Sequence, residues 1–307
     1  MKATDVFPLI GEAIRAAGPL YGPAYQGKIQ EQGFEPGQWY LLVVGHDFEP
    51  EPVSAEIFAL RSPYSDPGVF ADNLAALAEQ GYYEALGDGR YCIADRGHEA
   101  IDVVMTAFND KVAEVKPLPE ADMNRIISLM QRLVEGALAA PEPAEKPILT
   151  VNRASDPGPD GAPMMRILQY AADLGSFRDE IHMAAWQTLD VSGPAWEALT
   201  LVWRDEANSA ATLAEQRQAR RISEEGYAAA LQSLVEKGWL APAGDDGVFE
   251  ITEAGRSVRQ HAEDETDRMY YVAWQALNEA EIAELGDLLA RMRDSAHEMA
   301  EAVAQEA

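Results

Sequence analysis

The sequence predicts a mainly α-helical protein made of two tandem copies of one unit, each with a small two-stranded β-hairpin. Apolar residues recur at helical spacing over most of the 307 residues, which is the pattern of helices with one buried face. Short segments of alternating apolar and polar residues flank Gly-rich turns, as in hairpins. The second half also repeats the apolar, aromatic and glycine positions of the first, which indicates a repeated structural unit.

The repeat is clearest between residues 70–100 and 227–257. Each segment has an aromatic residue, leucines at helical spacing, and a glycine followed by another aromatic residue. A segment rich in Pro, Gly and charge separates the two copies, which is linker composition. We therefore expect one copy at 1–140, a linker at 141–162 and a second copy at 163–307. The aligned positions are Phe70, Leu74, Leu77, Gly81 and Tyr82 in the first copy, and Tyr227, Leu231, Leu234, Gly238 and Trp239 in the second.

Three helices are expected early in the second copy. The first follows a Gly-Pro breaker at Gly193 and carries an apolar stripe at helical spacing. A short second helix over residues 209–221 has Ser209 as its candidate N-cap. The third runs from its cap, Ser223, to Gly238, which suits the left-handed position that ends a helix.

A hairpin and two long helices are expected to complete this copy. Strands stand on both sides of the GDDG turn at residues 244–247, because the flanking residues alternate and the turn is rich in glycine. Residues 252–277 and 278–305 then continue as two long helices with apolar residues on one face.

This order of elements resembles the winged helix of MarR-type transcriptional regulators. In that family the outer helices form a dimer, and the second helix of the helix-turn-helix enters the major groove of DNA. The C-terminal half also resembles an uncharacterised bacterial family with a winged helix. The residues that carry this second resemblance are Gly238, Trp239, Leu240, Thr252, Gly255, Arg256, Glu263, Thr266 and Asp267.

The MarR resemblance implies that the two copies form a pseudo-dimer within one chain. We expect the outer helices of both copies to share one apolar core. The residues expected in that core are Val104, Phe108, Ile126 and Leu133 of the first copy and Met269, Leu285 and Met292 of the second.

The charge of the chain opposes DNA binding. Asp and Glu number 52 against 24 Lys and Arg, a formal net charge of −28, and such a field repels polyanions. Acids also outnumber bases from Ser223 to Arg256, with Asp245 and Asp246 at the tip of the expected wing. The alternative for the few arginines nearby is that they are solvated helix ends paired with acids. The arginines placed to contact phosphate are Arg61, Arg90, Arg217, Arg220 and Arg221.

An aromatic cluster is the candidate ligand site. In MarR-type proteins a crevice between the dimer helices and the DNA-reading motifs holds regulatory ligands, so the resemblance implies a pocket for a small hydrophobic molecule, with His182 as its polar group. The alternative is that these rings are core and that His182 is a satisfied interface residue. The aromatic residues concerned are Trp186, Trp196, Trp203, Tyr270 and Tyr271.

The sequence gives no support for catalysis, a metal or a cofactor. The HEAID and HEMAE segments lack the second histidine of a zinc protease motif, and no phosphate-binding glycine loop or G-x-S-x-G occurs. The single cysteine, Cys92, excludes an intramolecular disulfide and favours the cytoplasm. No uncharged apolar stretch approaches the length of a membrane span. We expect a soluble cytoplasmic protein that is not an enzyme.

Three functions remain open. The first is a transcriptional regulator that binds DNA and a small ligand. The second is an acidic winged-helix scaffold that binds a basic protein or mimics DNA. The third is a ligand sensor without DNA binding.

Overall fold

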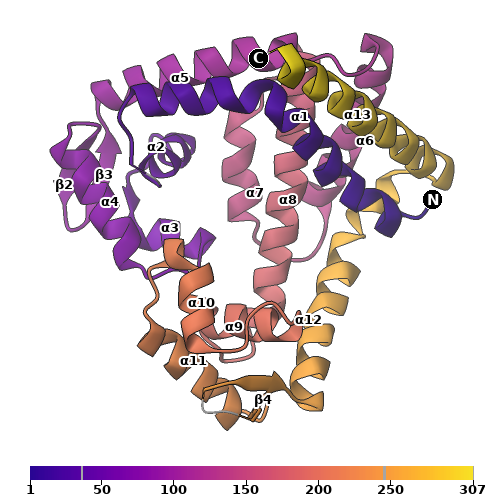
Figure 1. The fold of residues 1–307 in the computed structure, drawn as a ribbon. Helices are drawn as coiled ribbons and strands as arrows, with labels where there is room; N and C mark the ends of the chain where they lie inside the picture. The colour runs from indigo at the N-terminus through magenta and orange to yellow at the C-terminus, as the bar shows by residue number, and fades with distance from the viewer. Residues whose placement is uncertain (36, 245–246, 307) are drawn as a thin grey trace. The chain divides into compact units, whose positions relative to one another are not determined.

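The computed structural model describes residues 1–35, 37–244 and 247–306, and it is mainly α-helical, as predicted (Figure 1). The chain forms two compact units. Unit 1 comprises Met1–Asp47, Asp95–Glu180 and Met269–Ala307, and unit 2 comprises Phe48–Ala94 and Ile181–Arg268. Each unit therefore takes segments from both halves of the chain.

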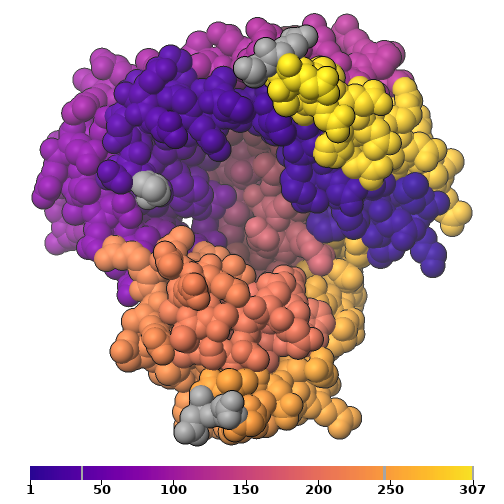
Figure 2. All heavy atoms as spheres, viewed as in Figure 1, coloured from indigo at the N-terminus to yellow at the C-terminus, as the bar shows by residue number. Residues whose placement is uncertain are grey.

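Unit 1 is a set of packed helices. Its long N-terminal helix α1 lies along α13 and also packs against α5, while α6 packs against η3 and α13. Figures 1 and 2 show α1 (indigo) beside α13 (yellow). Its elements are α1 (Ala3–Glu31), α2 (Gln38–Asp47), α5 (Asp95–Glu114), α6 (Glu120–Ala139), α7 (Pro147–Asn152), η1 (Arg153–Ser155), most of α8 (Pro163–Gln187), η3 (Ala273–Ala276) and α13 (Glu279–Glu306).

The apolar core of unit 1 joins helices from the two halves of the chain. In α6, Ile126 and Leu133 are fully buried, and so are Leu285 and Met292 in α13, a helix that packs against it. Gly136 lets the backbones approach, because a Cβ at that position would lie 2.7 Å from the carbonyl oxygen of Ala273. Helices α6 and α13 thus contribute to one apolar core.

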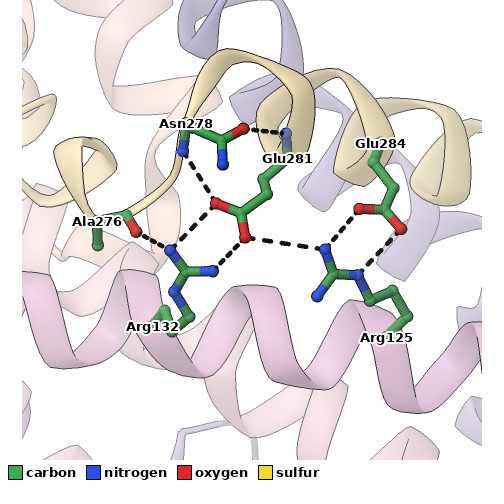
Figure 3. Close-up of polar contacts among 6 residues, drawn as sticks. All are labelled: Arg125, Arg132, Ala276, Asn278, Glu281 and Glu284. Atoms are coloured by element: carbon green, nitrogen blue, oxygen red, sulfur yellow. Dashed lines mark hydrogen bonds and ion pairs between the residues drawn. The ribbon is translucent and has the colours of Figure 1, made fainter.

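An ionic network stands at the edge of this core (Figure 3). Arg132 of α6 donates from Nη1 to Glu281 Oε1 at 2.5 Å and also donates to the Ala276 carbonyl. Arg125 donates from Nε and Nη2 to Glu284, at 3.0 and 2.6 Å. The Glu281 carboxylate also accepts from the backbone N–H of Asn278 at 3.0 Å. The side-chain Oδ1 of Asn278 in turn accepts from the backbone N–H of Glu281 at 3.0 Å. Glu281 therefore caps α13 reciprocally and holds α6 to it.

The segment expected to be a linker, residues 141–162, contains α7 and η1 and is packed onto α8. Leu149 is fully buried, and the amides of Ile148 and Leu149 donate to the Glu180 carboxylate at 2.6 and 3.1 Å. A carboxylate at the start of a helix satisfies amides that have no partner within it. The Pro- and Gly-rich composition does predict loops, but it gives no sign of this distant carboxylate.

A buried carboxylate secures the other end of α7. Asp173 of α8 is fully buried and accepts from Asn152 Nδ2 and from Arg153 Nη1, each at 2.7 Å. Burial raises the pKa of Asp173, while these hydrogen bonds and the Arg153 charge act in the opposite direction. This part of the chain is therefore held by buried polar contacts as well as by Leu149.

Unit 2 contains two helix pairs, and a β-hairpin follows each of them. The first pair is α3 (Ala55–Arg61) with α4 (Gly68–Glu79), and the second is α10 (Ala210–Gln216) with α11 (Glu224–Glu236). The sheets are antiparallel, with order β1-β3-β2 in the first copy and β4-β5 in the second, where Ser209 and Val248 form an isolated bridge. The elements are β1 (Val53–Ser54), α3 (Ala55–Arg61), α4 (Gly68–Glu79), β2 (Tyr83–Gly87) and β3 (Arg90–Ile93), then α9 (Gly193–Trp203), α10 (Ala210–Gln216), η2 (Gln218–Arg220), α11 (Glu224–Glu236), β4 (Leu240–Pro242), β5 (Phe249–Ile251) and most of α12 (Glu253–Tyr270).

Aligned positions of the two copies have the same local structure in unit 2. Gly81 and Gly238 have positive φ values of 80° and 73°, as the left-handed end of a helix requires. The amide of the following aromatic residue then donates to the carbonyl of a leucine in the preceding helix, at 2.9 Å in both copies: Tyr82 to Leu77 and Trp239 to Leu234. The two aligned segments thus share the way in which a helix ends before a hairpin.

The helix starts in the second copy follow the prediction, and two helix ends do not. Ser209 Oγ accepts from the Thr212 amide at 3.3 Å, and Ser223 Oγ accepts from the Gly226 amide at 3.1 Å. The second helix ends at Gln216 rather than at 221, because the chain turns through η2 and Arg221 adopts φ of 54°. The helix expected over residues 252–277 ends at Tyr270 and is followed by η3. The predicted wing-tip acids Asp245 and Asp246 lie outside the described residues. No helix in the described ranges is long and apolar enough to cross a membrane.

The network in Figure 3 predicts a pH-dependent stability. Hydrogen bonds from Arg132 and Arg125 hold the pKa values of Glu281 and Glu284 below their ordinary range. A lowered carboxyl pKa stabilises the folded state above the ordinary value of about 4.3, and this stabilisation is lost as pH falls through the lowered value. The double variant Arg125→Gln, Arg132→Gln should unfold at a lower temperature than wild type at pH 7, and the difference should shrink towards pH 3.

Thermal unfolding followed by circular dichroism measures this difference. The control is Lys111→Gln, which removes an exposed pair with Glu114 within α5 and should shift the midpoint less at pH 7. A difference between the double variant and wild type that stays constant from pH 7 to pH 3 would contradict the role of the network.

Candidate nucleic-acid interface

The second helix of each pair, α4 or α11, is the one expected to read DNA in a helix-turn-helix. One face of each is buried through the aligned aromatic and leucine residues, such as Tyr227 and Leu231 in α11. Neither helix contains Lys or Arg, so their exposed faces offer no cation to phosphate. The exposed residues are Ala71, Asp72, Ala75 and Glu79 in α4, and Glu224, Glu225, Ala228, Ala229, Gln232 and Glu236 in α11.

Of the two candidate arginines in the first copy, one is available on the surface. Arg90 begins β3 and is exposed, and its side chain makes no ion pair or hydrogen bond with a residue that the structure describes. Arg61 is in the last turn of α3 and is half-buried. Its Nη1 is buried without a hydrogen-bond partner among the described residues. Arg90 is therefore the better placed of the two to meet a phosphate.

Arg220 links the two helix pairs of unit 2. Its Nη1 donates to Ser62 Oγ at 2.9 Å and to Ser65 Oγ at 3.3 Å, and its guanidinium lies over the Tyr64 ring, 5.4 Å from the centroid. The Arg220 carbonyl accepts from the Asp66 amide at 2.9 Å. We call this set of contacts, between residues 62–66 and the turn before α11, the interpair contact.

A partly buried carboxylate completes the interpair contact. Glu197 of α9 lies 3.4 Å from Arg220 Nε and 3.5 Å from Arg217 Nε, and it accepts from Tyr227 Oη at 3.1 Å. Burial, followed by the negative charge of Glu197, raises the pKa of Tyr227. Arg221 forms an exposed ion pair with Asp72 at 2.9 Å. Arg217, Arg220 and Arg221 are thus all paired with acids, which is the alternative that the sequence left open.

The interpair contact brings the starts of α4 and α11 together. Asp66 is two residues before α4, and Arg220 is four residues before α11, yet their backbones are hydrogen-bonded. Close packing continues at Gly193, where a Cβ would lie 1.9 Å from the Pro63 carbonyl oxygen. In two-fold helix-turn-helix dimers the reading helices are instead about 34 Å apart, one turn of DNA.

The residues proposed as a ligand pocket are distributed over both units, and three of the six, Trp186, Trp196 and Tyr270, are buried. His182, Trp186, Trp196 and Trp203 belong to unit 2, whereas Tyr270 and Tyr271 belong to unit 1. The rings of Trp186 and Trp196 are buried and stacked, with centroids 5.7 Å apart. The two ring nitrogens of His182 lie 3.2 Å from Trp196 Nε1 and 3.3 Å from Thr266 Oγ1. This burial supports the packing alternative for these rings.

A buried arginine that sequence reasoning missed completes this aromatic core. Arg259 is 2% exposed, and its guanidinium lies over the rings of Trp196 and Trp203, at 5.2 and 4.9 Å. It pairs with Glu263 at 2.5 Å and donates from Nε to Thr200 Oγ1 at 3.0 Å. Burial lowers the pKa of Arg259. Its spacing of four residues from Glu263 is a helical ion-pair signal that the sequence does contain.

These elements define the class of protein as a helix-turn-helix protein. The model of a helix-turn-helix family matches residues 71–303, from α4 to α13, and the chain belongs to this family. The match covers the second helix pair in full and begins within the first. No curated protein matches the chain, and no solved structure does.

Two neighbouring arginines allow a test of the interpair contact. Arg220→Ala removes two hydrogen bonds and one partner of the partly buried Glu197, so we expect a loss of about 1 to 2 kcal/mol in unfolding free energy. Arg221→Ala removes only an exposed pair, which should cost less than about 1 kcal/mol.

Urea unfolding followed by tryptophan fluorescence measures both losses, since Trp186, Trp196 and Trp203 are in unit 2. Equal, small losses for both variants would show that Arg220 does not hold the helix pairs together.

Proposed function

We propose that the protein is a winged-helix transcriptional regulator of MarR-like type, which binds DNA in the cytoplasm and acts through binding rather than catalysis. The observation that carries the proposal is the presence of two helix pairs followed by hairpins, with the same local structure at aligned positions. Family membership supports it. Packing of α6 against η3 and α13 supports a pseudo-dimer formed by tandem duplication.

DNA contact in this proposal depends on the first hairpin. The reading-type helices α4 and α11 carry no cation, and the arginines near α11 are paired with acids. Arg90 is exposed on β3, at the position of a wing. On α11, the exposed Gln232 offers an amide of the kind that reads adenine in the major groove. With so few cations, specific base contacts must supply a larger share of the affinity than phosphate attraction does.

The interpair contact opposes this function, and we infer that it opens on DNA. Two reading helices can enter successive major grooves only if their starts separate to about one turn of DNA. A binding-competent state that is rarely populated weakens the observed affinity in proportion to its population. Weakening the interpair contact should therefore strengthen DNA binding. This result is expected even though the substitution removes an arginine, a cation that attracts phosphate.

Fluorescence anisotropy with labelled genomic fragments, at about 50 and 200 mM salt, tests the proposal. Arg90→Ala should weaken binding and reduce the salt slope by about 1, as expected for one lost phosphate contact. Arg220→Ala should strengthen binding, because it weakens the interpair contact. Arg291→Ala, which removes an exposed pair with Asp122 in unit 1, should change nothing.

The absence of binding at about 50 mM salt would contradict a DNA-binding role, since phosphate attraction is strong there. Weaker binding by Arg220→Ala would instead show that Arg220 contacts DNA directly, as the sequence predicts.

A second function is favoured by the acids on the same helices. Glu224, Glu225 and Glu236 are exposed on α11, so this face suits a basic protein partner or mimicry of DNA. The double variant Glu224→Lys, Glu225→Lys distinguishes the two functions. It should increase affinity for DNA if α11 faces phosphate, and it should abolish capture of a basic partner if α11 is a protein-binding surface. Capture can be measured by cross-linking in lysate from the source organism.

A further inference from the structure

Unit 1 contains a groove between α1 and α8 that neither the helix pairs nor the predicted aromatic site uses. Its volume is about 710 Å³, within the range of sites for small molecules. Phe7, Ile10 and Ile14 of α1 line one side, and Leu168, Ala172 and Gly175 of α8 line the other. Figure 2 shows rose atoms, the colour of α7 and α8, recessed beside those of α1 (indigo).

The charge of the groove is opposite to that of the protein. The chain has 52 Asp and Glu against 24 Lys and Arg, yet the described residues that line the groove include no acid, and Arg15 is the one charged residue among them. Arg15 is exposed, and its side chain makes no ion pair or hydrogen bond with a residue that the structure describes. Its guanidinium lies over Gly11, where a Cβ would be 3.1 Å from Nη1. An apolar surface with a single available cation is complementary to an amphipathic anion.

We propose that this groove binds a small amphipathic carboxylate, with its apolar chain or ring against α8 and its carboxylate paired with Arg15. A second copy of the protein is disfavoured as the occupant, because two chains that each carry a formal net charge of −28 repel each other. The proposal does not rest on DNA binding, since the groove is formed within unit 1 and the helix pairs are in unit 2. A failure to bind DNA leaves it intact.

The groove owes its depth to small residues on α8. At Gly175 a Cβ would have no atom within 4 Å, so a larger side chain there extends into open space instead of into packed core. Gly175→Leu therefore places a side chain in the groove, and its Cβ meets no packed atom. Gly27 of α1 is a matched control, because a Cβ there also meets nothing within 4 Å and the residue does not line the groove.

The full-length protein can be tested with a fluorescent carboxylate, 11-(dansylamino)undecanoate, whose emission rises in an apolar site. We expect saturable binding that dodecanoate displaces. Gly175→Leu should abolish binding, and Gly27→Leu should leave it unchanged. Arg15→Met should lower the affinity for dodecanoate by about fivefold, the size of one exposed ion pair. The same substitution should leave the affinity for dodecanol unchanged. The unfolding temperature of each variant shows that the fold is retained.

Three results would overturn the proposal. The first is unchanged binding to Gly175→Leu, which would place the probe elsewhere. The second is an equal effect of Arg15→Met on dodecanoate and dodecanol, which would remove Arg15 from recognition of the carboxylate. The third is a dimer in analytical ultracentrifugation that Gly175→Leu dissociates, which would make the groove an interface between two copies.

Discussion

The packing of α6 against η3 and α13 is the contact on which unit 1 depends. Apolar burial drives this packing but does not itself select one alignment of the helices, because the hydrophobic effect is non-directional. The alignment is selected by Arg125 and Arg132, which are two helical turns apart on α6 and reach Glu284 and Glu281 on α13. Since Glu281 also caps α13, the same carboxylate fixes where that helix begins and where α6 lies against it. Helices from both halves of the chain therefore complete the unit.

Local features of this fold could be predicted from the sequence, because their causes lie within a few residues. The Ser209 and Ser223 caps and the left-handed Gly238 are of this kind, and each depends on a backbone group at most five residues away. The partners of Arg220 are different. Ser62 and Ser65 are 158 and 155 residues away in the chain, and no local pattern specifies them. For the same reason, the docking of α7 onto Glu180 could not be predicted from the sequence.

The candidate ligand sites show a related limit of sequence reasoning. The sequence predicts that Trp186 and Trp196 line a ligand pocket. Large aromatic rings, however, are also the side chains that best fill a core, and in the structure these two rings stack within the core. A groove forms where side chains are too small to fill the space between helices, as at Ala172 and Gly175. Small residues give a weak periodic signal, so the position of a cavity depends on which helices come together.

The scarcity of cations limits the sites at which this acidic chain can attract an anion. Several arginines are engaged with acids inside the protein, as Arg132, Arg220 and Arg259 are, and an engaged cation is less available to phosphate. Among the candidate anion contacts in the described ranges, Arg15 and Arg90 are those that are both exposed and without an ion pair. The surroundings of Arg15 and Arg90 determine which kind of anion each arginine suits. Arg15 borders an apolar groove, which favours a small molecule with a carboxylate, whereas Arg90 stands exposed on a hairpin, where an extended phosphate backbone can approach.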